Sequence, residues 1–544
     1  GASRALNLAR DALHFPLEDA EKVPFLWEES SPEWYFDILD ALRPANMIAT
    51  LEAKGVPTDL SEAQFGVQYS LQAFTPDELK AFEQPTALKA LSLPAANKFI
   101  PDSVALIPQS PTKVIDEAGL RLFFAQDTEF KRPLVSYQVR IRQPKSLGKL
   151  RAVVMRDFYT SVLNEIINEQ AYAASVAGLT VRVVNGAKGI SLAVSGYNQS
   201  ANTVLEDVLK QMRKLELEEA RFEAIKERKV RELQNAVFAD AWRQAMQVER
   251  KLFYEHYFTP EEQLPIAEDL TLSQLKKYAL SLFKKGNVEM MAYGNVNQSE
   301  AEALARGVIS TLKLKPVATR DVYETRVLTL EQGKPVIASN TLKVNNSAYR
   351  QGFHLGEATP RNRAATAMIQ NFFADLYFSE MRTRQQLGYI VGGFTTENED
   401  NLYARFVIQS ADYSADKLLD LSETFLSTLP SLLDALPDEK LEAIRAAVRS
   451  ELEKKDKSIA ERSARYFNLA FEQNENWSRA RDTLTALEQL SRKDLRAMLE
   501  KIANSSDVSS FAVLSLAEQH ADSAASVKTS FSDIKKWKRK QDFN

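Results

Sequence analysis

The sequence contains no cysteine and only four histidines among its 544 residues. Without cysteine the chain has no disulfide bonds, no thiolate metal ligands and no cysteine nucleophile. The histidines are far apart, and none belongs to an HExxH, HxxEH or HxH pattern; they are His14, His256, His354 and His520. A hydrolytic metal site usually needs two or three clustered histidine and carboxylate ligands. The spacing therefore predicts no metal site on this chain, and a site assembled from distant segments is the alternative left open.

Neither sign of charge dominates, and long apolar runs are absent. The 69 Lys and Arg residues nearly balance the 73 Asp and Glu residues, so nothing favours nucleic acid or an anionic membrane as a partner. No apolar run approaches the roughly 20 residues of a membrane span. Charged residues at 26% and hydrophobic residues at 44% are typical of a soluble globular protein. The length predicts about three or four folded units.

Motifs for covalent or nucleotide chemistry are also absent. No GxSxG, Walker-type or GxGxxG pattern occurs in its required context. Gly392-Gly393 lies in an expected strand, where paired glycines favour a close backbone approach or a bulge over phosphate binding. The lysine-rich segment 535–540 is expected to be a solvated end. A metal-independent hydrolase is therefore a poor hypothesis, because the chain offers no nucleophile paired with a base.

The N-terminus lacks an initiator Met and the basic and apolar segments of a signal peptide. Gly1-Ala2-Ser3 runs at once into a helical pattern. We interpret this start as a processing boundary or a cut inside a larger protein.

A pattern of elements occurs twice. Apolar and polar residues alternate over 134–142, as in a half-buried strand. A long helical pattern then stops at Gly178, two strands form a hairpin over 179–197, and a helix starts at Ser200. About 210 residues later the order returns, with a strand through Tyr349, Phe353 and Leu355, a helix that stops at Gly388, a hairpin over 389–409 and a helix from Ser414.

Both sets continue in the same way. Charged helices follow at 216–255 and 437–470, and each set closes with a helix and a strand. Thr271-x-x-Gln274 and Ser491-x-x-Asp494 are capping-box patterns at equivalent places. The agreement over about 200 residues predicts an internal duplication. The expected fold class is α+β, with two tandem homologous units that are each an antiparallel-rich sheet covered by helices.

The N-terminal part carries a fragment of the same pattern. Ser31 is a candidate N-cap for a helix that leads to a strand at Met47–Leu51, which resembles the closing piece of one more unit. The proline-rich segment that follows has no sustained period, which suits an extended linker.

The stretch Phe372–Gln409 places two functional side chains close together. Apolar residues at helical spacing end at Leu387, and Gly388 follows where a helix often needs a left-handed residue. Arg382 would lie on the last helical turn and Tyr389 just beyond the bend. One interpretation is a helix-end arginine bound to carbonyl groups beside an ordinary strand tyrosine. The other is a cation and a phenol held together for chemistry.

A resemblance favours the second interpretation. RTRQQLGYIV at 382–391, with Phe378 before it, resembles a signature in the C-terminal half of the insulysin/pitrilysin family of zinc metallopeptidases. Further segments resemble the same family in the same order: HFPLEDA (14–20), ALRPANM (41–47), NKFIPDS (97–103), NEQAYAASVAGL (168–179), SGYNQ (195–199) and RFVIQS (405–410).

The resemblance implies four homologous α+β units, like those of mitochondrial processing peptidase, paired as two halves around a chamber for peptides. The family's HxxEH zinc site lies in the first unit and is absent here. The chain would comprise the end of a preceding unit (1–54), a linker (55–111), an inactive third unit (112–325) and an inactive fourth unit (326–544).

By resemblance, Arg382 and Tyr389 would hold the substrate and the developing oxyanion, and Phe378 would line the substrate pocket. The chain alone is expected to be inactive and to carry no cofactor, with zinc in the N-terminal half. Expected partners are that half, peptides or small unfolded proteins, and a second copy of the chain, with no nucleic acid and no membrane. The alternative is a natural non-catalytic subunit of a two-chain processing-peptidase-like complex. The sequence does not fix the compartment, and the periplasm is the family's usual location in bacteria.

Overall fold

The computed structural model describes residues 2–16, 19, 32–83, 97, 115–504, 508–525 and 528–544. The chain divides into two compact units, Gly1–Ala96 and Asn97–Asn544. Ser31 and most of the NKFIPDS segment lie outside the described residues. None of the helices in the described part is long and apolar enough to cross a membrane.

The first compact unit contains short elements: α1 (Ala2–Asp11), α2 (Pro32–Ala41), η2 (Pro44–Asn46), β1 (Leu60–Ser61), β2 (Gln68–Tyr69) and α3 (Pro76–Glu83). The strand predicted at Met47–Leu51 is wrong, since these residues belong to no strand. A strand needs a neighbouring chain to complete its hydrogen bonds. Within the described residues of this unit, segment 47–51 has no such neighbour.

The second compact unit begins with a six-stranded sheet, which we call the first sheet. Its strands are β3 (Ile115–Glu117), β4 (Leu120–Gln126), β5 (Leu134–Arg142), β6 (Thr180–Gly186), β7 (Gly189–Tyr197) and β8 (Asn287–Gly294). Their order is β3-β4-β8-β5-β7-β6, and only the β4–β8 pair is parallel. The accompanying helices are α4 (Leu150–Ile166), α5 (Asn168–Val176), α6 (Asn198–Lys214), α7 (Glu219–Asn235), α8 (Ala241–Phe253), α9 (Pro260–Glu268), α10 (Leu272–Leu282) and α11 (Gln298–Leu312).

A five-stranded sheet, the second sheet, follows. Its strands are β9 (Val336–Thr341), β10 (Ser347–Glu357), β11 (Ile390–Asn398), β12 (Asn401–Ser410) and β13 (Ser510–Leu516), in the order β11-β12-β10-β13-β9. Its helices are α12 (Pro360–Phe378), α13 (Ala415–Leu426), α14 (Leu429–Asp434), α15 (Asp438–Leu452), α16 (Ile459–Phe471), α17 (Arg479–Glu488), α18 (Arg492–Ala503) and α19 (Ile534–Lys538).

The two sheets confirm the predicted duplication and the α+β fold class. The order β4-β8-β5-β7-β6 in the first sheet matches β9-β13-β10-β12-β11 in the second. The parallel pair also occupies the same place, β4 with β8 and β9 with β13. Both predicted capping boxes are present, at Thr271 and Ser491. The helix predicted to stop at Gly178 is two helices, interrupted at Ile167.

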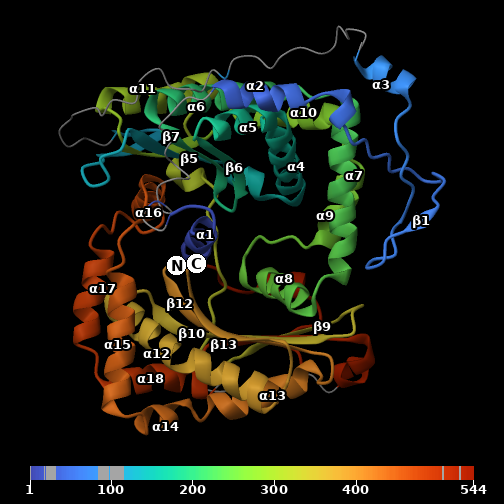
Figure 1. The fold of residues 1–544 in the computed structure, drawn as a ribbon. Coiled ribbons are helices and arrows are strands. Elements are labelled where there is room, and N and C mark those ends of the chain that lie inside the picture. The colour runs from blue at the N-terminus through green and yellow to red at the C-terminus, as the bar shows by residue number, and fades with distance from the viewer. Residues whose placement is uncertain are drawn as a thin grey trace. The chain divides into compact units, whose positions relative to one another are not determined.

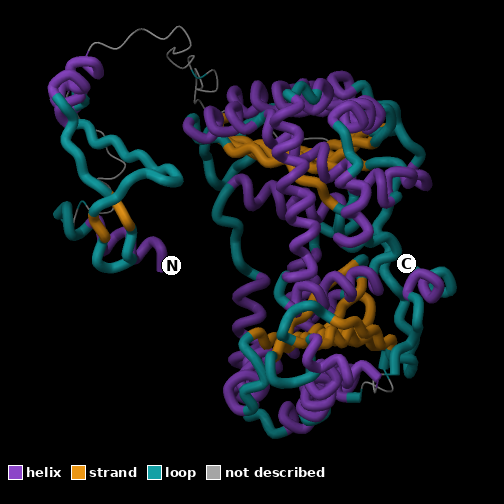
Figure 2. Tube along the Cα trace, turned by 90° about the vertical axis from the view of Figure 1, so that its right-hand side faces the viewer, coloured by secondary structure: helices purple, strands orange, loops and turns teal. Residues whose placement is uncertain are grey.

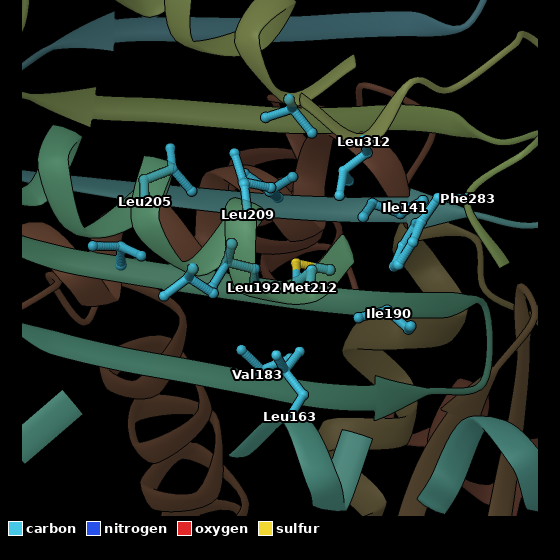
Figure 3. Packing of buried hydrophobic residues seen from close by; sticks show 14 of the residues in the cluster. Ile141, Leu163, Val183, Ile190, Leu192, Leu205, Leu209, Met212, Phe283 and Leu312 are labelled. Carbon is cyan, nitrogen blue, oxygen red and sulfur yellow. The ribbon is translucent and has the colours of Figure 1, made fainter. Parts of the chain in front are cut away.

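Each sheet has its own hydrophobic core. In the first sheet, apolar residues of β5 and β7 pack against one face of α6, as Figure 3 shows for Leu192, Leu205 and Leu209. Tyr349, Phe353 and Phe406 occupy the equivalent core of the second sheet. The two sheets form separate layers, each with helices on the side away from the other sheet (Figure 2).

The charged helices cross between the two repeats. Helix α8 belongs by sequence to the first repeat but packs against β10, β12 and β13 of the second sheet, and α16 of the second repeat packs against β5 and β8 of the first (Figure 1). Glu249 on α8 is buried and pairs with Arg350 and Arg405 of the second sheet. Arg140 on β5 pairs with Glu472, directly after α16. Helices α8 and α16 therefore cover the faces of the two sheets that lie toward each other, and they hold the two repeats together in one compact unit.

The expectation of a solvated end near the C-terminus is wrong for Lys538, whereas Lys535, Lys536, Arg539 and Lys540 are exposed. Nζ of Lys538 donates hydrogen bonds to the carbonyl oxygens of Lys251, Tyr254 and Glu255 at the end of α8. These carbonyls have no partner within the helix, and a lysine is a suitable cap for them. Burial lowers the pKa of Lys538 to about 8.

Candidate functional site

The site lies where α12 gives way to β11. Phe378 is the last residue of α12, and the chain continues into a wider π turn, Ser379–Arg384. Arg382 lies on this turn, as predicted for the last helical turn. Single π turns at the ends of helices often occur at functional sites, because they turn side chains out of the helical register.

The predicted role of Gly388 is wrong in part. The left-handed residue that ends the turn is Gln386, with φ of +54°, and Gly388 is not left-handed. Gly388 is needed for a different reason, since a Cβ there would lie 1.8 Å from the carbonyl oxygen of Gln409. Only glycine lets the backbone approach this closely. The approach places Tyr389 directly beside the π turn.

Two buried side chains anchor the turn on either side of Arg382. Met381 and Leu387 are 0% and 2% exposed and belong to the core of the second sheet. The amide of Leu387 donates to the carbonyl oxygen of Met381 at 2.9 Å, which closes the turn. Arg382 is therefore carried by a rigid segment although its side chain points outward.

The three predicted site residues lie together. The guanidinium carbon of Arg382 is 4.3 Å from the centre of the Tyr389 ring and 5.3 Å from that of Phe378. One guanidinium nitrogen, Nη1, also donates to the carbonyl oxygen of Tyr389. Tyr389 is 77% exposed and Phe378 41%. The arginine is thus stacked between two rings whose outer surfaces are open.

The charge of Arg382 is not neutralised within the part of the chain that the structure describes. Arg384, two residues on, pairs with Glu380, whereas Arg382 has no carboxylate partner there. The remaining guanidinium N–H groups and the Tyr389 hydroxyl are hydrogen-bond donors on adjacent side chains. Together they can bind a carbonyl oxygen or an oxyanion.

No metal centre accompanies this site among the described residues, where no group of three or more His, Asp or Glu side chains is placed to hold an ion. His354 packs against Tyr403 and lies 2.9 Å from Oδ1 of Asn401, and burial lowers its pKa. His520 lies 2.9 Å from Oγ of Ser347. His354 therefore has a packing role, as expected.

Two features of the site could not be predicted from the sequence. The first is the π turn. In the sequence, only the apolar residues Met381 and Leu387 indicate that this segment is anchored in the core. The other is helix α8, which forms a cavity with β11 close to Tyr389. A sequence pattern gives no sign of this contact, because α8 and β11 are separated by more than a hundred residues.

Comparisons with known proteins agree with this fold. The family model described as "Middle or third domain of peptidase_M16" matches residues 2–265. A second, "PQQ synthase PqqF-like, C-terminal lobe domain 4", matches residues 368–467. Human insulin-degrading enzyme is 27% identical over 89% of this chain and 48% of its own length. The A-factor-processing enzyme of Saccharomyces cerevisiae is 24% identical over 80% of this chain and 43% of its own length.

Solved structures agree as well. Pitrilysin matches all of this chain and 59% of its own with a TM-score of 0.81 at 18% identity. A peptidase M16 inactive domain from Pseudomonas fluorescens matches 74% of this chain and 98% of its own, with a TM-score of 0.55 at 15% identity. The chain spans about half the length of the curated relatives it matches. The chain is therefore similar to the C-terminal half of peptidases of the M16 family, the insulysin/pitrilysin family.

Proposed function

We propose that this chain is the substrate-binding half of a zinc-dependent peptidase and completes an active site whose zinc ligands lie in a separate N-terminal half. Arg382 and Tyr389 would donate hydrogen bonds to the peptide backbone and to the oxyanion that forms during hydrolysis. Phe378 would line the pocket for the substrate side chain.

The observation that carries the proposal is the exposed stack of Phe378, Arg382 and Tyr389, with no carboxylate for Arg382 in the described chain. An arginine that serves only the fold is usually paired or turned to solvent. This arginine is held between two rings on a rigid turn, so its geometry is set before a ligand arrives. Such preorganised donors stabilise charge that develops in a transition state, and losing one typically costs about 3–4 kcal/mol.

The proposed partner and domain boundaries have support in the first compact unit. Helix α2 presents five large apolar side chains to solvent, and Leu42 directly after it is a sixth: Trp34, Tyr35, Phe36, Ile38, Leu39 and Leu42. Trp34 is 72% exposed and Ile48, just beyond the helix, 90%. In the repeats, the equivalent strands β8 and β13 lie inside a sheet, and the equivalent helices α10 and α18 contribute buried residues to the core. Residues 1–54 would therefore complete a preceding unit of the N-terminal half, followed by the linker (55–111), the third unit (112–325) and the fourth (326–544).

The test is cleavage of a quenched fluorogenic peptide, with zinc content measured in parallel. The assay compares this chain alone with this chain mixed with the N-terminal half. Activity only on mixing, and its loss with Arg382→Ala or Tyr389→Phe, is the expected result. Stoichiometric zinc and turnover by the chain alone would contradict the proposal.

One observation favours a second candidate, a non-catalytic subunit that acts as a separate chain. The structure described as a peptidase M16 inactive domain from Pseudomonas fluorescens is covered over 98% of its length by this chain. If this candidate is correct, Arg382→Ala will leave the activity of the mixed halves unchanged while assembly of the halves persists.

A further inference from the structure

The two edges of the second sheet differ. At one edge, β9 is covered by the chain near its C-terminus: the amide of Ile337 donates to Oγ of Ser530 at 2.8 Å, and its carbonyl oxygen accepts from the amide of Ser530 at 2.9 Å. At the other edge lies β11, whose only neighbour in the sheet is β12 among the described strands. Exposed edges are normally protected in proteins, because they can recruit another strand.

The backbone groups on the free edge of β11 can be identified. The amide of Thr395 donates to Oε1 of Gln370 on α12 at 2.7 Å, so it points away from β12. In an antiparallel strand, residues two apart direct their N–H and C=O groups to the same side. Val391 and Gly393 therefore direct theirs outward as well, and no partner for them occurs within the described residues. Gln370 therefore occupies the edge of β11 at Thr395. The backbone groups of Val391 and Gly393, nearer to Tyr389, remain without a partner among the described residues.

The usual protections are absent from this part of β11. The pairing with β12 runs without a bulge from Ile390 to Asn398. Residues 390–396, IVGGFTT, contain neither a charge nor a proline. A flat, uncharged edge of this kind is suited to accept an extended chain through main-chain hydrogen bonds.

A cavity lies on one face of the same strand. It measures about 360 Å³ between α8 and the sheet, and Ile390 and Phe394 line it from β11. Trp242 and Met246 line it from α8, and Glu249 with Arg350 and Arg405 forms a charged wall. Side chains of an added strand would alternate between the two faces of the sheet. Every second side chain would therefore face this largely apolar cavity.

We propose that an extended peptide segment adds as a strand to the outer edge of β11 at Val391–Gly393 and places an apolar side chain in the cavity beside α8. The inference rests on the proposed function, because it names the part of a peptide substrate that this half would hold next to Arg382 and Tyr389. Hydrogen bonds to the backbone would supply affinity for any sequence, and the cavity would favour a large apolar residue.

The test is binding of a fluorescein-labelled peptide of about ten residues, with Leu at its centre and Lys at both ends, followed by fluorescence anisotropy on the full chain. Val391→Pro removes the outward N–H, and Val391→Ala is the matched control that shortens the side chain but keeps the N–H. Proline is tolerated on an edge strand where its nitrogen faces outward. We expect Val391→Pro to weaken binding about tenfold more than Val391→Ala, as for one lost hydrogen bond. Equal affinities of the two variants would overturn the proposal.

A second measurement does not depend on whether the proline variant folds. The same peptide with alternate amides N-methylated is offered to the unaltered chain, and about tenfold weaker binding is expected. Met246→Trp should fill the cavity and abolish the preference for central Leu over central Ala, whereas Met246→Leu should keep it. Unchanged binding of the methylated peptide would overturn the inference. The proposed function would survive that result if Arg382→Ala still abolished activity of the mixed halves.

Discussion

The guanidinium carbon of Arg382 lies 4.3 Å from the centre of the Tyr389 ring, and Nη1 of the same group donates to the carbonyl oxygen of Tyr389. The two residues are on different elements, a π turn and the start of β11, which Gly388 brings together. A planar cation can stack on a ring and still direct N–H groups along its edge. The position of the Arg382 guanidinium therefore depends on the Tyr389 ring, and the position of that ring depends on the guanidinium.

Arg382→Lys should consequently behave almost like Arg382→Ala. An ammonium keeps the positive charge but loses the planar stack and the fixed direction of the donors. We expect a loss of about a hundredfold in kcat/KM for the mixed halves, equivalent to about 2.7 kcal/mol. Arg384→Lys is the control, because Arg384 pairs with Glu380 at the surface. Near-normal activity of the Arg382→Lys variant would show that charge alone is sufficient.

Features that depend on neighbouring residues could be predicted from the sequence. Alternation over 134–142 predicted β5, and the order of a helix, a glycine and a hairpin predicted both repeats. The same local pattern placed Arg382 and Tyr389 on adjacent elements. These predictions held because each rests on periodicity or turn chemistry within a short segment.

Features that depend on distant contacts could not be predicted. The crossing of α8 and α16 between the repeats depends on the packing of both sheets. Lys538 looked like part of a solvated end until the end of α8 was placed beside it. Gly388 was identified as special, but the sequence alone did not distinguish a left-handed residue from a close backbone approach.

Replacing Glu249 should destabilise the chain strongly. Its carboxylate is buried between Arg350 and Arg405, and burial lowers the pKa of both arginines to about 10. Glu249→Gln would leave two buried cations without a counter-charge, so we expect a loss of about 3–5 kcal/mol in the free energy of unfolding. Urea titration measures it. Glu227→Gln, which removes an exposed pair with Arg231, should cost less than about 1 kcal/mol.

The stability contributed by Glu262 should depend on pH. Burial opposes its ionisation, but hydrogen bonds from Lys251, Lys535 and the amide of Thr259 outweigh this and lower its pKa to about 2. Because the folded pKa is below the usual 4.5, the contribution is complete above pH 4.5 and disappears as the pH falls toward 2.

Glu262→Gln should therefore destabilise the chain at pH 7 and progressively less below pH 4.5. Allowing for solvent screening of this partly exposed group, we expect about 1 kcal/mol at pH 7. Urea titrations of both proteins at pH 7 and pH 3.5 measure the change. A pH-independent difference would mean that packing, not charge, is lost.

Gly388→Ala should impair both folding and function. The added Cβ would lie 1.8 Å from the carbonyl oxygen of Gln409, a backbone atom that cannot move without breaking the pairing of β11 with β12. Gly307→Ala on α11 is the control, because a Cβ there would have no atom within 4 Å and the position lies outside the proposed binding edge. We expect the first variant to lose at least about 2 kcal/mol of stability and most activity of the mixed halves, and the second to keep both. If Gly388→Ala folds and remains active, Tyr389 does not need this close approach to be positioned.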